Sequence, residues 1–272
     1  MNKATLIISI YNNIEFLEVV LDSVKQQTTQ EFEVIISEDA NHPEVAAFIE
    51  NYNYPGELYH LTQPDKGWQK NRALNRAIVK ASTDYLVFID GDCVLHPRFM
   101  EFHLMLAKSD TILAGKRIKL DPDSTKWLMA SAERIPQFQK YLRNNYSKMK
   151  KRGAAFMEEG FFINPKGMLG FIPKLRSMYQ LKGCNMSFSK EAIVAINGFD
   201  EDYVKPAVGE DADLLWRFKA AGYKIGSVRN LAVQYHLYHK EGWTDQEDNL
   251  ALMQKNMENN QYICLNGINQ HL

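Results

Sequence analysis

The chain of 272 residues has few cysteines, and they are poorly placed for a shared structural role. Cys93, Cys184 and Cys264 are far apart in sequence and form no C-x-x-C pair. An odd number of widely spaced cysteines predicts neither a disulfide framework nor a cysteine zinc site, and it favours a reducing compartment. We expect Cys93 and Cys184 to pack as small hydrophobic side chains.

The chain also has little net charge and no long hydrophobic run. Its 32 basic and 33 acidic residues give a net charge of -1, which argues against nucleic acid as a partner. No window reaches the 18 uncharged apolar residues typical of a membrane span, and Met1–Lys3 leads directly into a strand-like segment. These features predict a soluble, cytoplasmic protein of ordinary globular composition, with 45% apolar and 24% charged residues.

The first 90 residues alternate between strand-like and helix-like patterns. Strands are expected at Thr5–Ile10, Phe32–Ser37, Leu58–Thr62 and Tyr85–Ile89, with helices at Ile14–Gln26, from His42–Pro43 onward, and at Trp68–Ala81. This alternation predicts an α/β fold with a largely parallel sheet and helices lying on it. Such sheets bind ligands at the carboxyl ends of their strands, so we expect the functional site there.

The second half is less regular. It predicts a helix at Phe99–Ala107, an extended segment at Thr111–Leu120, a helix at Asp211–Ala221 and a strand at Leu231–Tyr235. Residues 140–182 hold ten basic and two acidic residues, a net charge of +8, so the rest of the chain carries -9. We expect this basic segment to be a mobile insertion over the site or a surface facing anionic lipid; a solvated basic face is the alternative.

Two carboxylates follow the fourth expected strand in the sequence Ile89-Asp90-Gly91-Asp92. Carboxylates at a strand end can hold a divalent cation on oxygen ligands, and glycine lets a phosphate approach closely. A turn or helix-cap role remains open for this pair when it is taken alone. Polar residues at other loops of the same sheet edge point to a shared crevice. They are Tyr11, Asn12, Asp39 and Arg72.

Several stretches together resemble the nucleotide-binding half of the family 2 glycosyltransferases, which have the GT-A fold. They are Ile7–Asn12, Ile35–Asp39, Lys66–Arg72 and Tyr85–Asp92. Three later stretches resemble the acceptor-side segment of galactosyl- and N-acetylgalactosaminyltransferases and of bacterial capsule polymerase domains. They are Lys182–Phe188, Asn197–Asp200 and Gly209–Leu214.

The matching stretches span roughly residues 5–240, and we expect one GT-A domain over residues 1–272. Its nucleotide-binding half would be residues 1–95, its acceptor-side half residues 96–245 with the basic insertion, and residues 246–272 would form a C-terminal helix. The nucleotide-binding residues implied by the resemblance are Ser9, Tyr11, Asn12, Asp39, Arg72, Asp90 and Gly91.

The resemblance also implies a metal site and a catalytic pair. Asp90, Asp92 and His236 would hold manganese or magnesium, with His239 as the alternative to His236 and a purely structural histidine still open. In Glu210-Asp211, Asp211 would be the general base and Glu210 would bind the acceptor. Acidic residues at a helix start also stabilise the helix dipole, which is the structural alternative for this pair.

The function implied is inverting transfer of a sugar from a nucleotide-sugar, a UDP-sugar, to a saccharide or lipid-linked saccharide. It would serve cell-surface polysaccharide or lipopolysaccharide synthesis, with peripheral contact to the inner membrane face through residues 140–182. Two alternatives are a nucleotidyltransferase and a non-catalytic nucleotide- or carbohydrate-binding module. The nucleotidyltransferase is disfavoured because Tyr11-Asn-Asn-Ile14 replaces a glycine-rich phosphate loop after the first expected strand.

Overall fold

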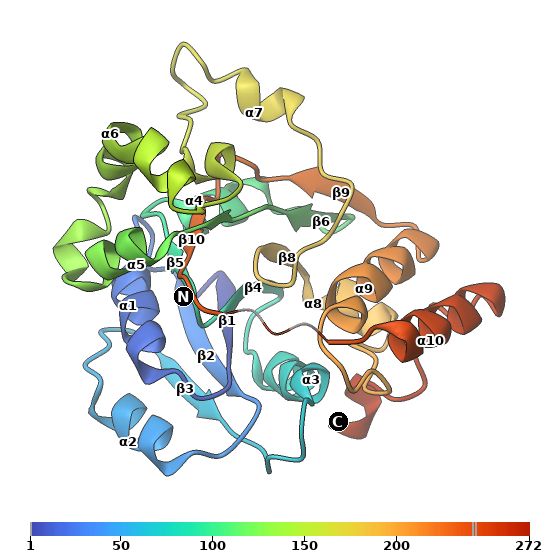
Figure 1. Ribbon diagram of the computed structural model, residues 1–272. Helices are drawn as coiled ribbons and strands as arrows, with labels where there is room; N and C mark the ends of the chain where they lie inside the picture. The colour runs from blue at the N-terminus through green and yellow to red at the C-terminus, as the bar shows by residue number, and fades with distance from the viewer. Residues whose placement is uncertain (1, 241, 243) are drawn as a thin grey trace.

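The computed structural model describes residues 2–240, 242 and 244–272, and a seven-stranded sheet forms its centre (Figure 1). The strands of this sheet are β1 (Ala4–Ile10), β2 (Phe32–Glu38), β3 (Leu58–Leu61), β4 (Tyr85–Asp90), β6 (Thr111–Ala114), β8 (Met186–Ser189) and β9 (Lys224–Ser227). Their order is β3-β2-β1-β4-β8-β6-β9. Neighbours pair in parallel except that β8 runs antiparallel to β4 and β6, which confirms the expected mostly parallel sheet.

A second, three-stranded sheet has the order β5-β10-β7. Its strands are β5 (Cys93–Leu95), β10 (Gln234–His236) and β7 (Ile118–Lys119). The single extended segment expected at Thr111–Leu120 is therefore wrong, because β6 and β7 belong to different sheets. The chain turns between them at Gly115, where an added Cβ would lie 2.4 Å from the Asn185 side chain. Only glycine fits this close approach, and after the turn β7 leaves the large sheet and pairs with β10.

Helices α1 (Ile14–Lys25), α2 (Pro43–Asn51) and α3 (Lys70–Lys80) connect the first four strands, close to the expected positions. The Asn13 side chain accepts a hydrogen bond from the Phe16 backbone N–H and so caps α1. Alternate residues of β1 lie in two separate hydrophobic clusters, with Leu6 and Ile8 in one and Ile7 in the other. The sheet therefore has a hydrophobic core on each face.

The later helices are α4 (Phe99–Leu106), α5 (Pro122–Met129), α6 (Phe138–Lys151), α7 (Ile172–Leu175), α8 (Lys190–Ala195), α9 (Val208–Ala220) and α10 (Glu247–Glu258). Short 3-10 helices are η1 (Ala132–Arg134), η2 (Met157–Gly160) and η3 (Ile268–Gln270). Within the described part of the chain, no helix has both the length and the hydrophobicity needed to cross a membrane.

The basic segment 140–182 begins inside α6, a regular helix that the sequence pattern did not predict. This helix buries only Phe138, Leu142 and Met149, a narrow apolar stripe among polar residues. So sparse a stripe gives a weak periodic signal, although three buried side chains are enough to attach the helix to the core. The first part of the expected insertion is therefore a packed element.

The C-terminal segment also differs from the expected helix over residues 246–272. Helix α10 ends at Glu258, and Asn260 then adopts a positive φ of 52°, a conformation common just beyond helix ends. The tail folds back onto the domain. The Ile268 N–H donates to the Asn197 carbonyl at 2.9 Å, and the Ile268 side chain is buried in the core.

Helix α9 is anchored by a buried ion pair between Arg217 and Asp213, whose Nη1 and Oδ2 atoms are 3.2 Å apart. Asp213 also accepts hydrogen bonds from the Tyr203 hydroxyl at 2.9 Å and the Trp216 indole at 3.0 Å. Arg217 donates to the Gly198 carbonyl at 2.8 Å. Asp213 therefore has a structural role, and Glu210 and Asp211 are the acidic residues of α9 that are candidates for a catalytic role.

We predict that Arg217→Leu lowers the free energy of unfolding by about 3–5 kcal/mol, because it leaves the Asp213 carboxylate buried without its cation. Denaturant unfolding followed by fluorescence measures this loss. Lys224→Ala is the control, since Lys224 pairs with Asp110 on the exposed surface and its removal should leave stability close to wild type. Similar losses in both variants would contradict the role given to Arg217.

Candidate active site

A cleft of about 560 Å³ lies at the carboxyl ends of β1, β2 and β4. It is lined by Ser9, Ile10, Tyr11, Asn12, Asn13, Phe16, Asp39, Asp65, Gly67, Trp68, Lys70, Asp90, Gly91, Asp92 and His239. This lining includes every expected nucleotide-binding residue except Arg72. Lys70, the first residue of α3, faces the cleft instead. The cleft therefore gathers the expected nucleotide-binding residues other than Arg72, whereas Glu210, Asp211 and His236 are not among its lining residues.

Asp39 and Tyr11 form one end of this cleft. The Asp39 carboxylate is almost fully buried, and it accepts hydrogen bonds from the Gln63 side chain at 2.7 Å and the Gln69 N–H at 2.8 Å. Burial raises the pKa of Asp39 even though these hydrogen bonds act in the opposite direction. The Tyr11 hydroxyl donates to Asp65 at 2.8 Å, and its side chain is 49% exposed. This end offers a fixed carboxylate acceptor beside an accessible aromatic ring.

Gly91 allows the tip of β4 to turn tightly against β1. Its N–H donates to the Ser9 carbonyl at 2.8 Å. An added Cβ at Gly91 would lie 2.5 Å from Ile10 Cγ2, so a larger residue would push the tip away. This close approach places Asp90 and Asp92 on the two sides of the turn, in separate surroundings.

Asp92 lies between two histidines. Its Oδ2 atom is 3.2 Å from His236 Nε2 and 3.0 Å from His239 Nε2. Burial alone would raise the pKa of Asp92, but the hydrogen bonds from His236 and His239 outweigh it and lower the pKa. Strand β10 positions His236 opposite Cys93, and the Leu237 N–H donates to the Asp92 carbonyl at 2.9 Å.

The ligand atoms of Asp92, His236 and His239 all lie within 4.8 Å of one another. One carboxylate and two imidazoles suit a transition-metal ion such as Mn²⁺ better than Mg²⁺, which prefers oxygen ligands. The residues present therefore fit a divalent transition metal. Both histidines lie beside Asp92, so His239 is a candidate ligand in addition to His236 and not only an alternative to it.

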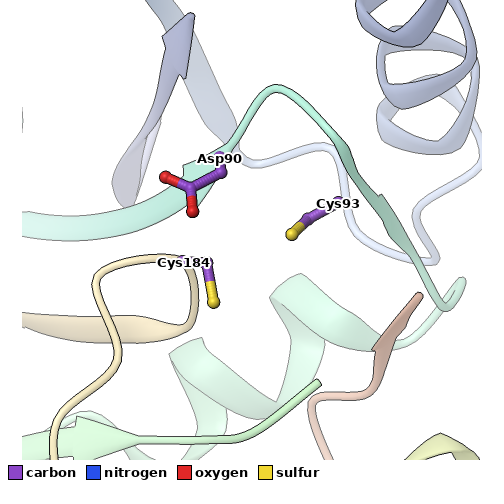
Figure 2. A group of neighbouring side chains, drawn as sticks. All are labelled: Asp90, Cys93 and Cys184. Atoms are coloured by element: carbon purple, nitrogen blue, oxygen red, sulfur yellow. The ribbon is translucent and has the colours of Figure 1, made fainter. Parts of the chain in front are cut away.

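Asp90 has different neighbours from Asp92. Its Oδ1 accepts a hydrogen bond from Lys70 Nζ at 2.8 Å, and its Oδ2 lies 3.9 Å from Arg117 Nη1. Its carboxylate lies close to the sulfurs of Cys93 and Cys184, which point into the same space (Figure 2). The structure thus pairs Asp90 with two cations, and a role for Asp90 in holding a metal stays a prediction.

The two cysteines of this group are fully buried, as expected for small packed side chains. Cys184 is also a hydrogen-bond acceptor, for Arg117 Nη1 at 2.6 Å and for Gln234 Nε2 at 3.2 Å. It therefore helps to hold Arg117 beneath Asp90. No pattern in the sequence singled out Arg117.

Glu210 and Asp211 lie in the first turn of α9 and face different partners. Glu210 Oε2 is 2.5 Å from Lys70 Nζ, so Lys70 bridges Glu210 and Asp90. Burial raises the pKa of Glu210 against the attraction of the Lys70 ammonium. The Asp211 carboxylate accepts a hydrogen bond from the Gly183 N–H at 2.5 Å and lies 3.2 Å from Lys182 Nζ.

The surroundings of Asp211 leave part of its carboxylate accessible, with 24% of the side chain exposed. The functional contacts of Lys70 and Lys182 were missed in the sequence, although both residues stand in the stretches Lys66–Arg72 and Lys182–Phe188. Their positions in the chain could have indicated these contacts. Lys70 is the first residue of α3, and Lys182 directly precedes Gly183, whose N–H donates to Asp211 on α9.

Two family models match the chain. The model described as glycosyl transferase family 2 matches residues 5–169, and the model described as the N-terminal domain of galactosyltransferase matches residues 172–240. The chain is 22% identical over 239 residues to chondroitin synthase from Escherichia coli, an alignment that covers 85% of this chain and 34% of that protein. The chain thus spans about a third of the length of this relative.

Solved structures resemble the fold. The mannosyltransferase PcManGT from Pyrobaculum calidifontis, in complex with GDP-Man and Mn²⁺, has a TM-score of 0.57 and 16% identity, covering 89% of this chain and 58% of that one. S. aureus TarS 1-349, in complex with UDP-GlcNAc, has a TM-score of 0.57 and 14% identity, covering 93% of this chain and 65% of that one. These likenesses confirm the expected GT-A fold.

We predict that Asp92→Asn and His236→Ala each raise the dissociation constant of Mn²⁺ by about tenfold or more, equivalent to about 1.4 kcal/mol or more of lost ligation. Electron paramagnetic resonance of free Mn²⁺ measures this binding without an activity assay. The same measurement on His239→Ala decides whether His239 is also a ligand.

The control for this measurement is His271→Ala, because His271 pairs with Glu201 at 2.6 Å rather than with Asp92. It should bind Mn²⁺ like the wild type. Unchanged Mn²⁺ binding in both Asp92→Asn and His236→Ala would exclude this cluster as the metal site.

Proposed function

The chain belongs to glycosyltransferase family 2, and on that premise we propose that it transfers a sugar from a UDP-sugar to a saccharide hydroxyl with inversion of configuration. The observation that carries the proposal is the arrangement around Lys70. This residue connects the tip of β4, beside the cleft, to the acidic start of α9. A donor in the cleft and an acceptor at α9 would then meet across a short distance.

The nucleotide end of the cleft supports a uracil donor. Uracil has one ring N–H, and the buried Asp39 carboxylate can accept a hydrogen bond from it. The exposed Tyr11 ring can pack on the base. One structural neighbour was solved with UDP-GlcNAc and another with GDP-Man, so both neighbours hold a nucleotide-sugar. The identity of the donor sugar depends on the pocket of this chain and can be measured by testing different nucleotide-sugars for binding.

The diphosphate leaving group gains negative charge as its bond to the sugar breaks. A divalent cation on Asp92 and His236 would supply Lewis-acid neutralisation of that charge. Lys70 lines the same cleft and carries a buried ammonium whose pKa is raised, because Asp90 and Glu210 together outweigh the cost of burial. Lys70 therefore remains protonated and adds a fixed positive charge near the leaving group.

Asp211 is the general base of the proposal. The acceptor hydroxyl gives its proton to the Asp211 carboxylate while its oxygen forms a bond to the anomeric carbon, and the bond from that carbon to the diphosphate breaks. A single in-line displacement of this kind inverts the configuration. Lys182 and the Gly183 N–H hold Asp211 in place, whereas Glu210 is engaged by Lys70 and would orient the acceptor.

The biological setting is proposed from the relatives. The chondroitin synthase relative is named for making a polysaccharide, and we place this chain in cell-surface polysaccharide synthesis with a saccharide or lipid-linked saccharide as acceptor. Cytoplasmic residence at the inner membrane face belongs to the same proposal. A chain that bound UDP-sugars without transferring or hydrolysing them would support the non-catalytic alternative.

We predict that Asp211→Asn lowers kcat by about 10²- to 10⁴-fold and leaves donor binding near wild type, because only proton acceptance is lost. Transfer of radiolabelled sugar to a saccharide acceptor measures kcat, and titration calorimetry measures donor binding. Asp202→Asn is the matched control, as Asp202 is an exposed acid that pairs with Asn266. If donor binding collapsed in Asp211→Asn, Asp211 would belong to the nucleotide site.

We predict that a UDP-sugar with Mn²⁺ stabilises the protein, by about 2.7 kcal/mol at a hundred times its dissociation constant. Thermal-shift screening against UDP-, GDP- and ADP-sugars measures this. Asp39→Asn should weaken UDP binding by about tenfold, because the amide of asparagine can present an N–H toward the uracil N–H. Equal stabilisation by all three nucleotides, or unchanged UDP binding in Asp39→Asn, would exclude uracil recognition by Asp39.

A further inference from the structure

A loop of residues 164–181, here called the projecting loop, stands away from the rest of the molecule and carries α7 (Figure 1). Five of its large side chains are exposed, whereas Met178 and Leu181 near its end are buried in the core. The exposed fractions are 91% for Met168, 51% for Leu169, 56% for Phe171, 75% for Leu175 and 79% for Tyr179. Single exposed apolar residues are ordinary on a protein surface, but five within twelve residues make this segment a candidate contact surface.

The projecting loop is fastened at its base. Arg176 Nη2 is 2.9 Å from the buried Glu159 carboxylate, and the Arg176 carbonyl accepts a hydrogen bond from the Ser227 hydroxyl at 2.5 Å. Arg229 pairs with the same Glu159. The turn at the tip is also tight, because a Cβ at Gly170 would lie 2.1 Å from the Pro165 carbonyl oxygen. These contacts hold the loop in a defined conformation, and the exposed apolar side chains project from it.

A basic surface lies beside the projecting loop. Helix α6 contains no acidic residue, and its exposed cations are Lys140, Arg143, Lys148, Lys150 and Lys151. Tyr146 of α6 contacts the ring of Phe161, just before the loop, with ring centroids 6.0 Å apart. The loop adds exposed Lys166 and Lys174. Exposed apolar side chains next to several cations are the combination that anionic lipid surfaces bind.

We propose that the projecting loop inserts its apolar side chains into the interface of an anionic lipid bilayer, while the basic face of α6 contacts the lipid headgroups. A second copy of this chain is a poorer occupant, because two surfaces with this excess of positive charge repel each other. The bilayer would also lie close to the acceptor side. Lys182 and Gly183 directly follow the loop and contact Asp211.

A membrane beside the acceptor side suggests how a lipid-linked acceptor would bind, an inference that rests on the proposed function. A saccharide carried on a lipid would reach Asp211 from the membrane side without leaving the bilayer surface. Binding to lipid itself needs neither the donor nor the cation, so it can be measured on the full chain alone.

Co-sedimentation with vesicles tests the proposal. The wild type should sediment with vesicles of phosphatidylcholine and phosphatidylglycerol, and much less with phosphatidylcholine alone. The triple variant Met168→Ser, Leu169→Ser, Leu175→Ser should lower the partition coefficient by about tenfold or more. Lys148→Gln, Lys150→Gln, Lys151→Gln should weaken binding and reduce its salt dependence. Met105→Ser on α4 is the control, being 58% exposed, and should bind like the wild type.

Three results would overturn the proposal. One is wild-type protein that stays in the supernatant with anionic vesicles while its thermal unfolding is cooperative. Another is a triple variant that binds as tightly as the wild type. The last is a wild-type dimer in gel filtration that the triple variant converts to a monomer, which would assign the loop to a second copy. Transfer to a water-soluble saccharide should be unchanged in the triple variant, so loss of lipid binding and failure of the proposed activity are distinguishable.

Discussion

The Lys70 ammonium is the contact on which the arrangement of this site depends. It lies 2.8 Å from Asp90 at the tip of β4 and 2.5 Å from Glu210 at the start of α9. Two carboxylates brought this close in a partly buried site repel each other unless a cation lies between them. Because Lys70 supplies that cation, the acidic turn of α9 can approach the strand tip. The same contact therefore sets the separation between the nucleotide cleft and Asp211.

The small three-stranded sheet completes the site from the other direction. His236 is far from Asp92 in sequence, and the pairing of β10 with β5 brings the two within 3.2 Å. The chain turns at Gly115 and leaves the large sheet before β7, and β7 then pairs with the other edge of β10. The histidines of the metal cluster and the acidic turn are thus held by different elements, and the tip of β4 lies between them, with Asp92 beside the histidines and Asp90 linked through Lys70 to Glu210.

The sequence predicted the repeated β-α pattern well, because β1 and β2 each contain a run of three aliphatic residues, Leu6–Ile8 and Val34–Ile36, and the amphipathic helix α1 lies between them. Parallel strands end at one edge of a sheet, and this rule alone located Asp39, Asp90 and Asp92 at the cleft. It failed for Arg72. Which residue of α3 faces the strand ends depends on where the helix begins, and the structure begins it at Lys70 rather than at the predicted Trp68.

Other features depend on tertiary contacts that no local pattern reports. The turn at Gly115 is required by the Asn185 side chain, about 70 residues later in the sequence. Arg117 lies near Asp90 and donates to the Cys184 sulfur, which also accepts a hydrogen bond from Gln234. None of these residues has a recognisable spacing in the sequence. The Glu210-Asp211 pair was visible in the sequence, but its division into one acid held by Lys70 and one partly exposed acid required the structure.

A crystal structure of the protein with Mn²⁺ and UDP, with anomalous data collected at the manganese absorption edge, would locate both the metal and the nucleotide. We predict an anomalous peak within bonding distance of Asp92 and His236. The diphosphate should lie on the metal and the uracil ring at Asp39, and Asp211 should be open to the same cleft. A manganese peak elsewhere with the nucleotide bound, or UDP seated away from Asp39 and Asp92, would contradict it.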